Sequence, residues 1–174
     1  IMELGEELRM HLTNLVGLEV LYEKALYPEL EYIFKHALTQ EVAYESLLKQ
    51  RRLEIHGRIA RAIEELYSDR LEQHYELLAH HWELSDNPDR AIEYLVLAGE
   101  KSNGSLAAKA AVDFFNRALS LIKKSDRDQD PALMMRIRIG RTKPLHIMGE
   151  IEKSLEDCEE AIRLAREQDD KQTA

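Results

Sequence analysis

The chain has 174 residues and a formal net charge of −9, which argues against nucleic acid as its main partner, because binding to phosphates needs clustered Lys and Arg. Its single cysteine excludes an internal disulfide and fits a reducing compartment, so we expect a cytoplasmic protein. No apolar run approaches the ~20 residues that span a bilayer, so no membrane partner is expected, and the lack of a leader pattern after Ile1 suggests that the chain was cut from a longer protein.

The first 48 residues combine a helix with a pair of strands. Leucines recur on one helical face up to Val16, and Gly17 is a suitable helix stop. Apolar and polar residues then alternate on either side of a polar loop that contains Pro28, which predicts a β-hairpin. A helix followed by a two-stranded wing is how a winged-helix domain ends, so residues 1–48 are interpreted as a winged-helix-like remnant. The alternative is a short hairpin of no functional meaning.

Residues 49–174 form the second predicted domain, and helical periodicity begins already at Ala37. Turns are expected at 85–88 and 148–150, and a polar linker at 125–131. The helix that begins at Ala37 is expected to pack inward through Val42, Ala43, Leu47 and Leu48. The stripes of the next two comprise Leu53, His56, Ile59, Ala60, Ile63, Leu66 and Tyr67, and then Leu71, Tyr75, Leu78, Ala79 and Trp82.

Three later helices share the pattern small-x3-large-x2-Ala, which lets helix backbones approach closely. The matches are Ala91, Leu95 and Ala98; Ala111, Phe115 and Ala118; and Ser154, Cys158 and Ala161. The pattern resembles the second helix of the tetratricopeptide repeat (TPR), and Gly99 falls where that repeat favours Gly. The spacing is irregular, and the helix Arg90–Ser102 has to serve two units, so the repeats are degenerate; any antiparallel helical bundle is the alternative. We therefore predict an all-α fold of antiparallel TPR-like hairpins in a right-handed array, with Cys158 buried and unreactive.

A longer stretch carries a resemblance to a family. Residues 32–48 read YIFKHALTQEVAYESLL, and Arg51-Arg52-x3-His56-x2-Ile59-Ala60-x-Ala62-Ile63-Glu64 follows. Together with Leu78-Ala79-His80-His81-Trp82 and Ala91-Ile92-Glu93-Tyr94-Leu95-x2-Ala98-Gly99, this is similar to the segment after the ATPase module in bacterial signalling proteins of the STAND class, over roughly residues 4–123. Many members join a class III adenylate/guanylate cyclase domain, an AAA-like ATPase and TPR-type repeats. The phosphate loop and the cyclase aspartates have no counterpart in this sequence, so ATP, ADP and a divalent metal are expected only in a parent protein, and no cofactor in this chain.

His36 is the one nucleotide-binding candidate that the resemblance implies. In STAND proteins a His at the comparable strand-to-helix position touches the phosphates of ADP and holds the inactive state. An imidazole beside a helix N-terminus is chemically suited to a phosphate. The alternative is that His36 caps the helix or packs in the fold.

Other clusters carry less. Glu76 and His80 are four residues apart on one helical face, with His74 and His81 nearby, but no second cluster with ligand spacing supports a metal site. Tyr75 and Trp82 are expected in the core. The basic run Lys49, Arg51, Arg52, Arg58 and Arg61 could meet DNA if the winged helix were a DNA reader, but its acidic surroundings favour a solvated face or a docking surface.

These observations predict a regulatory protein–protein interaction module of a multidomain signalling ATPase, with no catalytic centre of its own. The expected partners are a protein or peptide on the repeat surface and the adjacent ATPase domain in cis. The alternative is a winged-helix/TPR transcription regulator that binds DNA.

Overall fold

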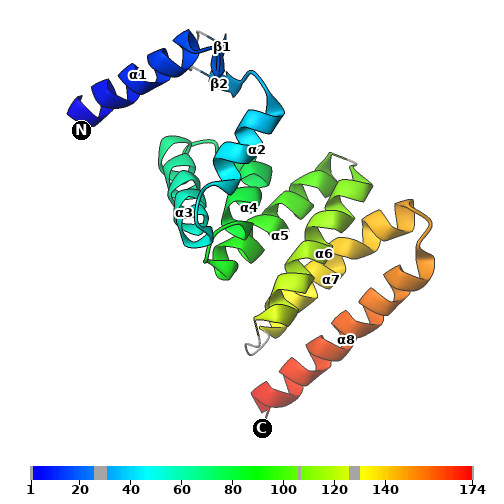
Figure 1. The fold of residues 1–174 in the computed structure, drawn as a ribbon. Coiled ribbons are helices and arrows are strands. Elements are labelled where there is room, and N and C mark those ends of the chain that lie inside the picture. Colours follow the sequence, from blue (N-terminus) through cyan, green and yellow to red (C-terminus); the bar gives the residue numbers. More distant parts are fainter. Residues whose placement is uncertain (1, 26–30, 106, 126–129, 174) are drawn as a thin grey trace. The chain divides into compact units, whose positions relative to one another are not determined.

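The computed structural model describes residues 2–25, 31–105, 107–125 and 130–173 (Figure 1). They form two compact units, Ile1–Arg52 (unit 1) and Leu53–Ala174 (unit 2). The division between the units falls within the first turn of a helix that begins at Lys49, a few residues after the predicted domain boundary.

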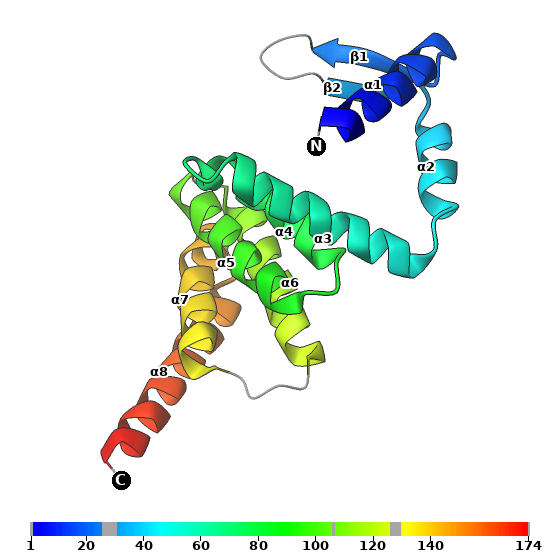
Figure 2. The ribbon, with the colours of Figure 1, turned by 90° about the vertical axis from the view of Figure 1, so that its left-hand side faces the viewer.

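Unit 1 contains a helix, a hairpin and a short second helix. Its elements are α1 (Met2–Gly17), β1 (Leu21–Ala25), β2 (Glu31–Phe34) and α2 (Ala37–Glu45). The two strands pair antiparallel with Leu21 opposite Phe34 (Figure 2), which confirms the predicted hairpin; its loop with Pro28 lies outside the described residues. Leu21 is buried, and the backbone N–H of Lys35 donates to the carbonyl of Val20 just beyond the ladder.

The prediction that α2 packs inward was wrong. This helix buries none of its residues; Val42 is 62% exposed and Leu48, just after the helix, is 80% exposed. Ala43 is exposed as well, and only Leu47 is partly covered. Within unit 1, α2 packs against β2, and this contact leaves most of its apolar side chains exposed.

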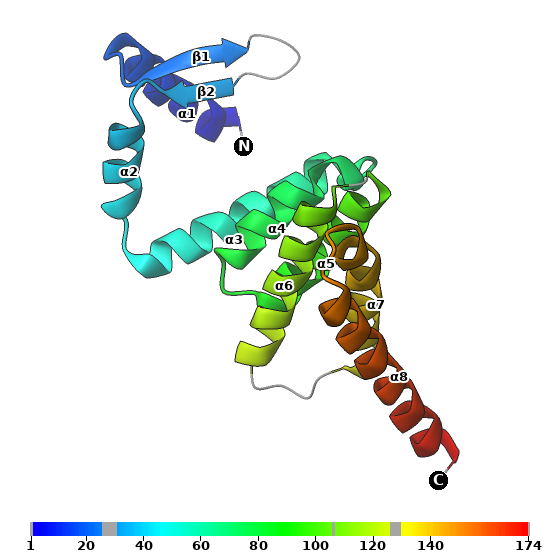
Figure 3. The same cartoon turned by 90° about the vertical axis from the view of Figure 1, so that its right-hand side faces the viewer.

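Unit 2 is a succession of helices, and the all-α class with a small hairpin is confirmed. Helices α4 to α8 run antiparallel to one another in chain order, and each packs on the next (Figures 1 and 3). The elements are α3 (Lys49–Leu66), the 3-10 turn η1 (Leu71–His74), α4 (Tyr75–Glu83), α5 (Pro88–Gly104), α6 (Ala108–Lys124), α7 (Pro131–Ile147) and α8 (Ile151–Thr173).

The helix starts of α5 and α7 use the same local chemistry. The side chain of Asn87 accepts from the N–H of Arg90 at 3.2 Å, and that of Asp130 accepts from the N–H of Ala132 at 3.0 Å. A proline follows each cap in the first helical turn, where no N–H is needed. The final turn ends at Gly149, whose φ of +79° favours glycine. Helices α5 and α7 therefore begin in the same way, with a side-chain cap followed by proline.

The residues of the predicted helix-packing pattern are buried, with one exception. The buried members are Ala91, Leu95, Ala98, Gly99, Ala111, Phe115, Ala118, Ser154 and Ala161. Cys158 is exposed, so the prediction of its burial was wrong. Asp157 is fully buried instead, because Ser154, Asp157 and Ala161 share the face of α8 that meets α7, whereas Cys158 projects from another face.

Phe115 of α6 holds α5 and α7 together. Its side chain has no exposed surface. A Cβ placed on Gly99 of α5 would lie 2.8 Å from ring atom Cζ, and one placed on Gly140 of α7 would lie 2.6 Å from the same atom. Both helices therefore approach the ring through a bare backbone, and Asn103 Nδ2 donates to the Gly140 carbonyl at 2.7 Å beside it.

We expect Gly140→Ala to lower the free energy of unfolding by about 1–3 kcal/mol, because the new methyl group overlaps a fully buried ring that has little room to move. Urea unfolding followed by circular dichroism measures this change. Gly104→Ala is the matched control, since a Cβ there meets no atom within 4 Å and gains helix propensity. If both variants are as stable as the parent, or more stable, the close contact of the Phe115 ring with Gly140 does not contribute to stability.

Candidate functional site

A groove lies between η1, the start of α4 and the second half of α5. It has a volume of about 550 Å³ and is lined by Glu72, Tyr75, Leu97, Glu100, Lys101, Gly104 and Ser105. Tyr75 and Leu97 are partly buried and pack against the hydrophobic core. This set of residues, named here the α4–α5 groove, offers an apolar floor with charged groups around it, as binding sites for side chains of a ligand do.

The charged groups beside the α4–α5 groove are fixed by ion pairs. Lys101 Nζ lies 2.8 Å from Glu76 Oε2 across the two helices. The Glu100 carboxylate accepts two bonds of 2.7 Å from the guanidinium of Arg136 on α7, and hydrogen bonding to Glu100 raises the pKa of Arg136. A bidentate pair of this kind restricts both side chains, so the groove is held in shape from three helices.

A second polar network positions α4 and α5. Trp82, predicted in the core, is buried, and its indole N–H donates to Glu64 Oε1 of α3 at 2.9 Å. Arg90 Nη2 lies 2.7 Å from the same oxygen, and Arg90 Nη1 lies 2.6 Å from Glu93 Oε2. Burial, followed by the hydrogen bond to Glu64, raises the pKa of Tyr94. One carboxylate thus ties α3 to both helices that form the groove.

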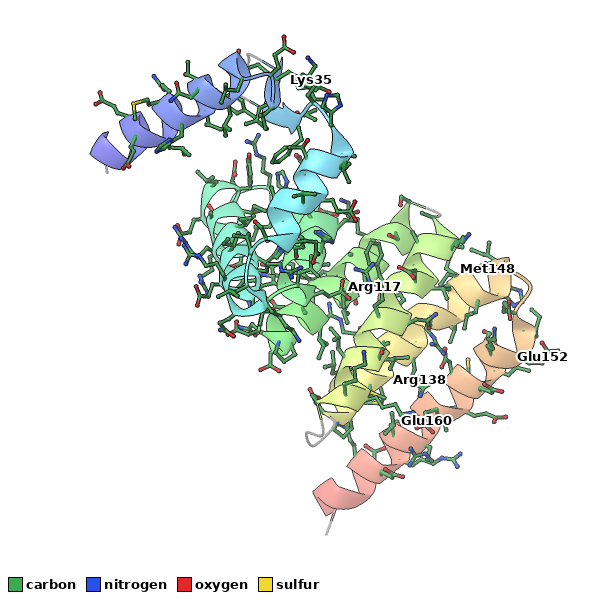
Figure 4. All side chains as sticks on the ribbon, viewed as in Figure 1. Lys35, Arg117, Arg138, Met148, Glu152 and Glu160 are labelled. Carbon is green, nitrogen blue, oxygen red and sulfur yellow. The ribbon has the colours of Figure 1, made fainter. Side chains whose placement is uncertain are left out.

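Helices α4 and α6 are also linked directly. The guanidinium of Arg117 on α6 (Figure 4) pairs with the carboxylate of Glu83 at the end of α4 and with Asp113 one turn away. The hydrogen bond to Glu83 is the main cause of the raised pKa of Arg117. This ion pair joins α6 to the C-terminal end of α4.

A buried ion-pair network holds α8 on α7. Asp157 has no exposed surface and lies 2.7 Å from both Arg138 Nη1 and Arg141 Nε. Arg141 Nη2 adds a bond of 2.9 Å, and Arg141 Nη1 donates to Asn116 of α6. Removing one partner of a buried ion pair is strongly destabilising, because the other charge is left buried and unpaired. This network of Asp157 with Arg138 (Figure 4) and Arg141 therefore determines which side of α8 faces outward.

Three histidines meet between α3 and α4, and the sequence analysis did not group them. His56 Nδ1 and His81 Nδ1 are 2.9 Å apart, so one ring donates and the other accepts. The ring of His80 lies 6.2 Å from that of His56 and 5.3 Å from that of His81, between centroids. Burial, and then the neighbouring His56 and His80, lowers the pKa of His81 to about 4; burial and then His80 lowers that of His56. The sequence offered one indication of this contact, because His56 lies on the stripe of α3 that was predicted to face the core.

The candidate metal ligands are separated by the structure. Glu76 pairs with Lys101, and the ring of His74 stacks on Tyr67 at 4.1 Å. His80 and His81 instead lie with His56. In the described part of the chain, no three His, Cys, Asp or Glu side chains are grouped so that they could hold a metal ion.

His36 lies at the N-terminus of α2, as the sequence predicted. It is the N-cap residue, its backbone carbonyl accepts from the N–H groups of Thr39 and Gln40, and its side chain makes no capping hydrogen bond. The imidazole is exposed. The preceding residue, Lys35 (Figure 4), forms an ion pair of 2.5 Å with Glu19. The interpretation of His36 as a side-chain cap is therefore not supported.

The basic run is partly engaged within the protein. Arg52 Nη1 lies 2.7 Å from Glu45, its Nε donates to the carbonyl of Leu47, and its guanidinium lies 4.9 Å from the centre of the Tyr44 ring. Arg58 and Arg61 line a depression of about 580 Å³ on α3 together with Glu65. This mixture of charges suits a docking surface better than a phosphate-binding one.

Comparison with known proteins gives no assignment: no protein-family model matches the sequence, and no curated protein matches it significantly. Within the described ranges, none of the helices combines the length and the apolar character needed to cross a membrane.

The histidine pair makes stability depend on pH. Because the pKa of His81 is about 4 in the folded chain and about 6.5 when unfolded, the unfolded state binds more protons below pH 6.5. We therefore expect the free energy of unfolding to fall as the pH drops from 6.5 toward 4, by roughly 1–2 kcal/mol after allowing for partial solvent screening.

Urea unfolding at pH 7 and pH 5 measures this loss. The variant His81→Gln should show a smaller difference between the two pH values, whereas His146→Gln, which alters an exposed histidine on α7, should keep the parent's difference. Equal pH dependence in all three proteins would contradict the role given to the pair.

Proposed function

We propose that the chain is a regulatory protein-interaction module and that the α4–α5 groove receives an apolar side chain of a protein or peptide partner. The observation that carries the proposal is the groove itself: Tyr75 and Leu97 form an apolar floor, and Glu72, Glu100 and Lys101 surround it. The ion pairs Glu76–Lys101 and Glu100–Arg136 orient charged side chains beside it in the absence of a ligand. A site that is already formed loses less conformational entropy on binding.

The charges around the groove define the partner's chemistry. Glu72 lines the groove, is acidic and is exposed, whereas Glu100 and Lys101 are paired with Arg136 and Glu76. A partner segment with one apolar anchor and a flanking basic residue would complement this surface. The expected affinity is modest, because a groove of this size buries one or two side chains.

The larger proposal is that the chain belongs to a signalling ATPase of the STAND class, with cyclase activity in a further domain as the output that the resemblance favours. Support comes from the residues that resemble that family and from the order helix, hairpin and helical repeats along the chain. In this proposal a partner on unit 2 shifts the ATPase between closed and open states. The adjacent ATPase domain binds ADP, and a divalent metal accompanies the nucleotide there.

His36 provides a test of that larger proposal. Its exposed imidazole at the start of α2 would contact the phosphates of ADP held by the ATPase domain. In a protein that joins this chain to such a domain, His36→Ala should increase the rate of ADP release, measured with a fluorescent ADP analogue, and raise basal activity. His11→Ala, at an exposed histidine on α1, is the control; equal release rates in the two variants would refute the role.

The α4–α5 groove is tested with peptides selected from a displayed random library against the full chain. Leu97→Glu, which places a charge on the apolar floor, should weaken binding of the selected peptides at least tenfold by fluorescence anisotropy. Leu97→Ala should weaken it less, and Ile162→Glu on α8 should leave it unchanged.

Two results would overturn the groove assignment. The first is that the selected peptides bind the Leu97→Glu variant as well as the parent while circular dichroism shows both folded. The second is sequence-specific DNA binding with steep salt dependence in a mobility-shift assay, which would favour the winged-helix regulator.

A further inference from the structure

Helix α8 has two faces with different surroundings. Ser154, Asp157 and Ala161 are buried on the face that meets α7. On the other side, an apolar stripe consisting of Ile151, Leu155, Cys158, Ile162 and Ala165 is exposed at one-turn spacing. Leu155 is 58% and Ile162 is 52% exposed. This set is named here the outer stripe of α8.

Helix α6 has a face that corresponds in sequence to the outer stripe of α8. The spacing that relates Asn87 to Asp130 and Pro88 to Pro131 also relates Ala111 to Ser154 and Ala118 to Ala161. By the same spacing Val112, Phe115 and Leu119 of α6 correspond to Leu155, Cys158 and Ile162 of α8. The outer stripe of α8 is therefore the counterpart of a defined face of α6.

That face of α6 is covered by α7. The ring of Phe115 lies against the backbone of Gly140, and Val112 lines a small pocket together with Leu145. Asn116, next to Phe115, accepts a hydrogen bond from Arg141. Three contacts thus define how an α7-type helix docks: a small residue against position 115, an Arg beside it and a Leu one turn later.

Acidic residues flank the first half of the outer stripe. Glu159 takes the place of Asn116, and it lines one surface depression together with Ile162, Arg163 and Arg166; Arg163 is paired with Glu160 and Glu167. Glu152 (Figure 4) and Glu156 lie along the same flank of α8. The helix α7 itself carries four basic residues and no acidic one: Arg136, Arg138, Arg141 and Lys143.

We propose that the outer stripe of α8 docks a basic amphipathic helix of a partner protein in the way that α6 docks α7. The partner helix places a small residue against Cys158, its next residue, an Arg, pairs with Glu159, and a Leu four residues further packs on Leu155. The outer stripe supplies apolar contact area, and the carboxylates of α8 supply orientation.

This docking surface is separate from the α4–α5 groove, and the two proposals stand or fall independently. The groove depends on Leu97 of α5, and the outer stripe depends on residues of α8 alone. Ile162→Glu therefore serves as the control for the groove, and Glu41→Arg, at an exposed position of α2 that belongs to neither surface, serves for the outer stripe.

The test uses the full chain and a fluorescein-labelled peptide with the sequence of residues 130–148, which carries the contacts of α7. We expect saturable binding by anisotropy. At saturation, alkylation of Cys158 by iodoacetamide should slow at least tenfold, because Cys158 is the only cysteine and lies in the middle of the stripe. Glu159→Arg should weaken binding at least tenfold, and a peptide carrying Arg141→Glu should restore it, whereas Glu41→Arg, a charge reversal at an exposed position of α2, should bind as the parent does.

Each other result overturns the proposal. An absence of saturable binding would do so, provided that circular dichroism shows the chain folded and the peptide helical in the buffer used. Binding that leaves Cys158 equally reactive, or that is unchanged by Glu159→Arg, would mean that the peptide binds elsewhere on the chain and not on the outer stripe. A dimer in sedimentation with Cys158 protected before any peptide is added would assign the stripe to a second copy of the chain.

Discussion

The arrangement of unit 2 depends on the ring of Phe115. It is buried completely, and it fills the space between two helices that reach it through glycines, Gly99 on α5 and Gly140 on α7. Because close-packed interiors accommodate added volume poorly, the ring sets the distance between α5 and α7. That distance in turn allows the bidentate pair of Glu100 with Arg136, which forms one side of the α4–α5 groove.

Polar contacts then fix the orientation of helices whose apolar packing alone would allow several. Small residues at the interfaces let the backbones approach closely, but they specify little about rotation. Glu64 joins α3 to Trp82 and Arg90, and Asp157 joins α8 to Arg138 and Arg141. Each of these carboxylates serves two partners. Because Asp157 has no exposed surface, a rotation of α8 would leave it buried and unpaired, at a cost of about 3–5 kcal/mol, whereas the partly exposed pair of Glu64 with Arg90 contributes less.

The sequence predicted the helices, the hairpin and the turn before Pro88 because those follow from short-range periodicity and turn chemistry. It placed Phe115 and Ala118 in the core correctly for the same reason. The prediction for Cys158 was wrong because residue type alone favours burying a cysteine rather than the aspartate before it. Asp157 is buried instead, since Arg138 and Arg141 of α7 pair with its carboxylate. The prediction also failed at Val42, since periodicity reports an amphipathic face but not whether the fold supplies something to cover it. The α4–α5 groove could not be predicted, because its walls come from side chains brought together by packing.

Helix α3 is joined to the α4–α5 groove through its contacts with α4. This helix begins at Lys49 in unit 1 and continues into unit 2, where its buried face holds His56 and Ile63. The His56–His81 contact and the Glu64–Trp82 hydrogen bond attach it to α4, which forms one wall of the groove. A partner that alters the position of α4 must therefore also strain these two contacts or move α3 with it. In the proposed regulatory role, the free energy available for switching is limited to the difference in partner affinity between the two positions of α4, and the polar contacts with α3 are the groups through which that difference reaches the rest of the chain.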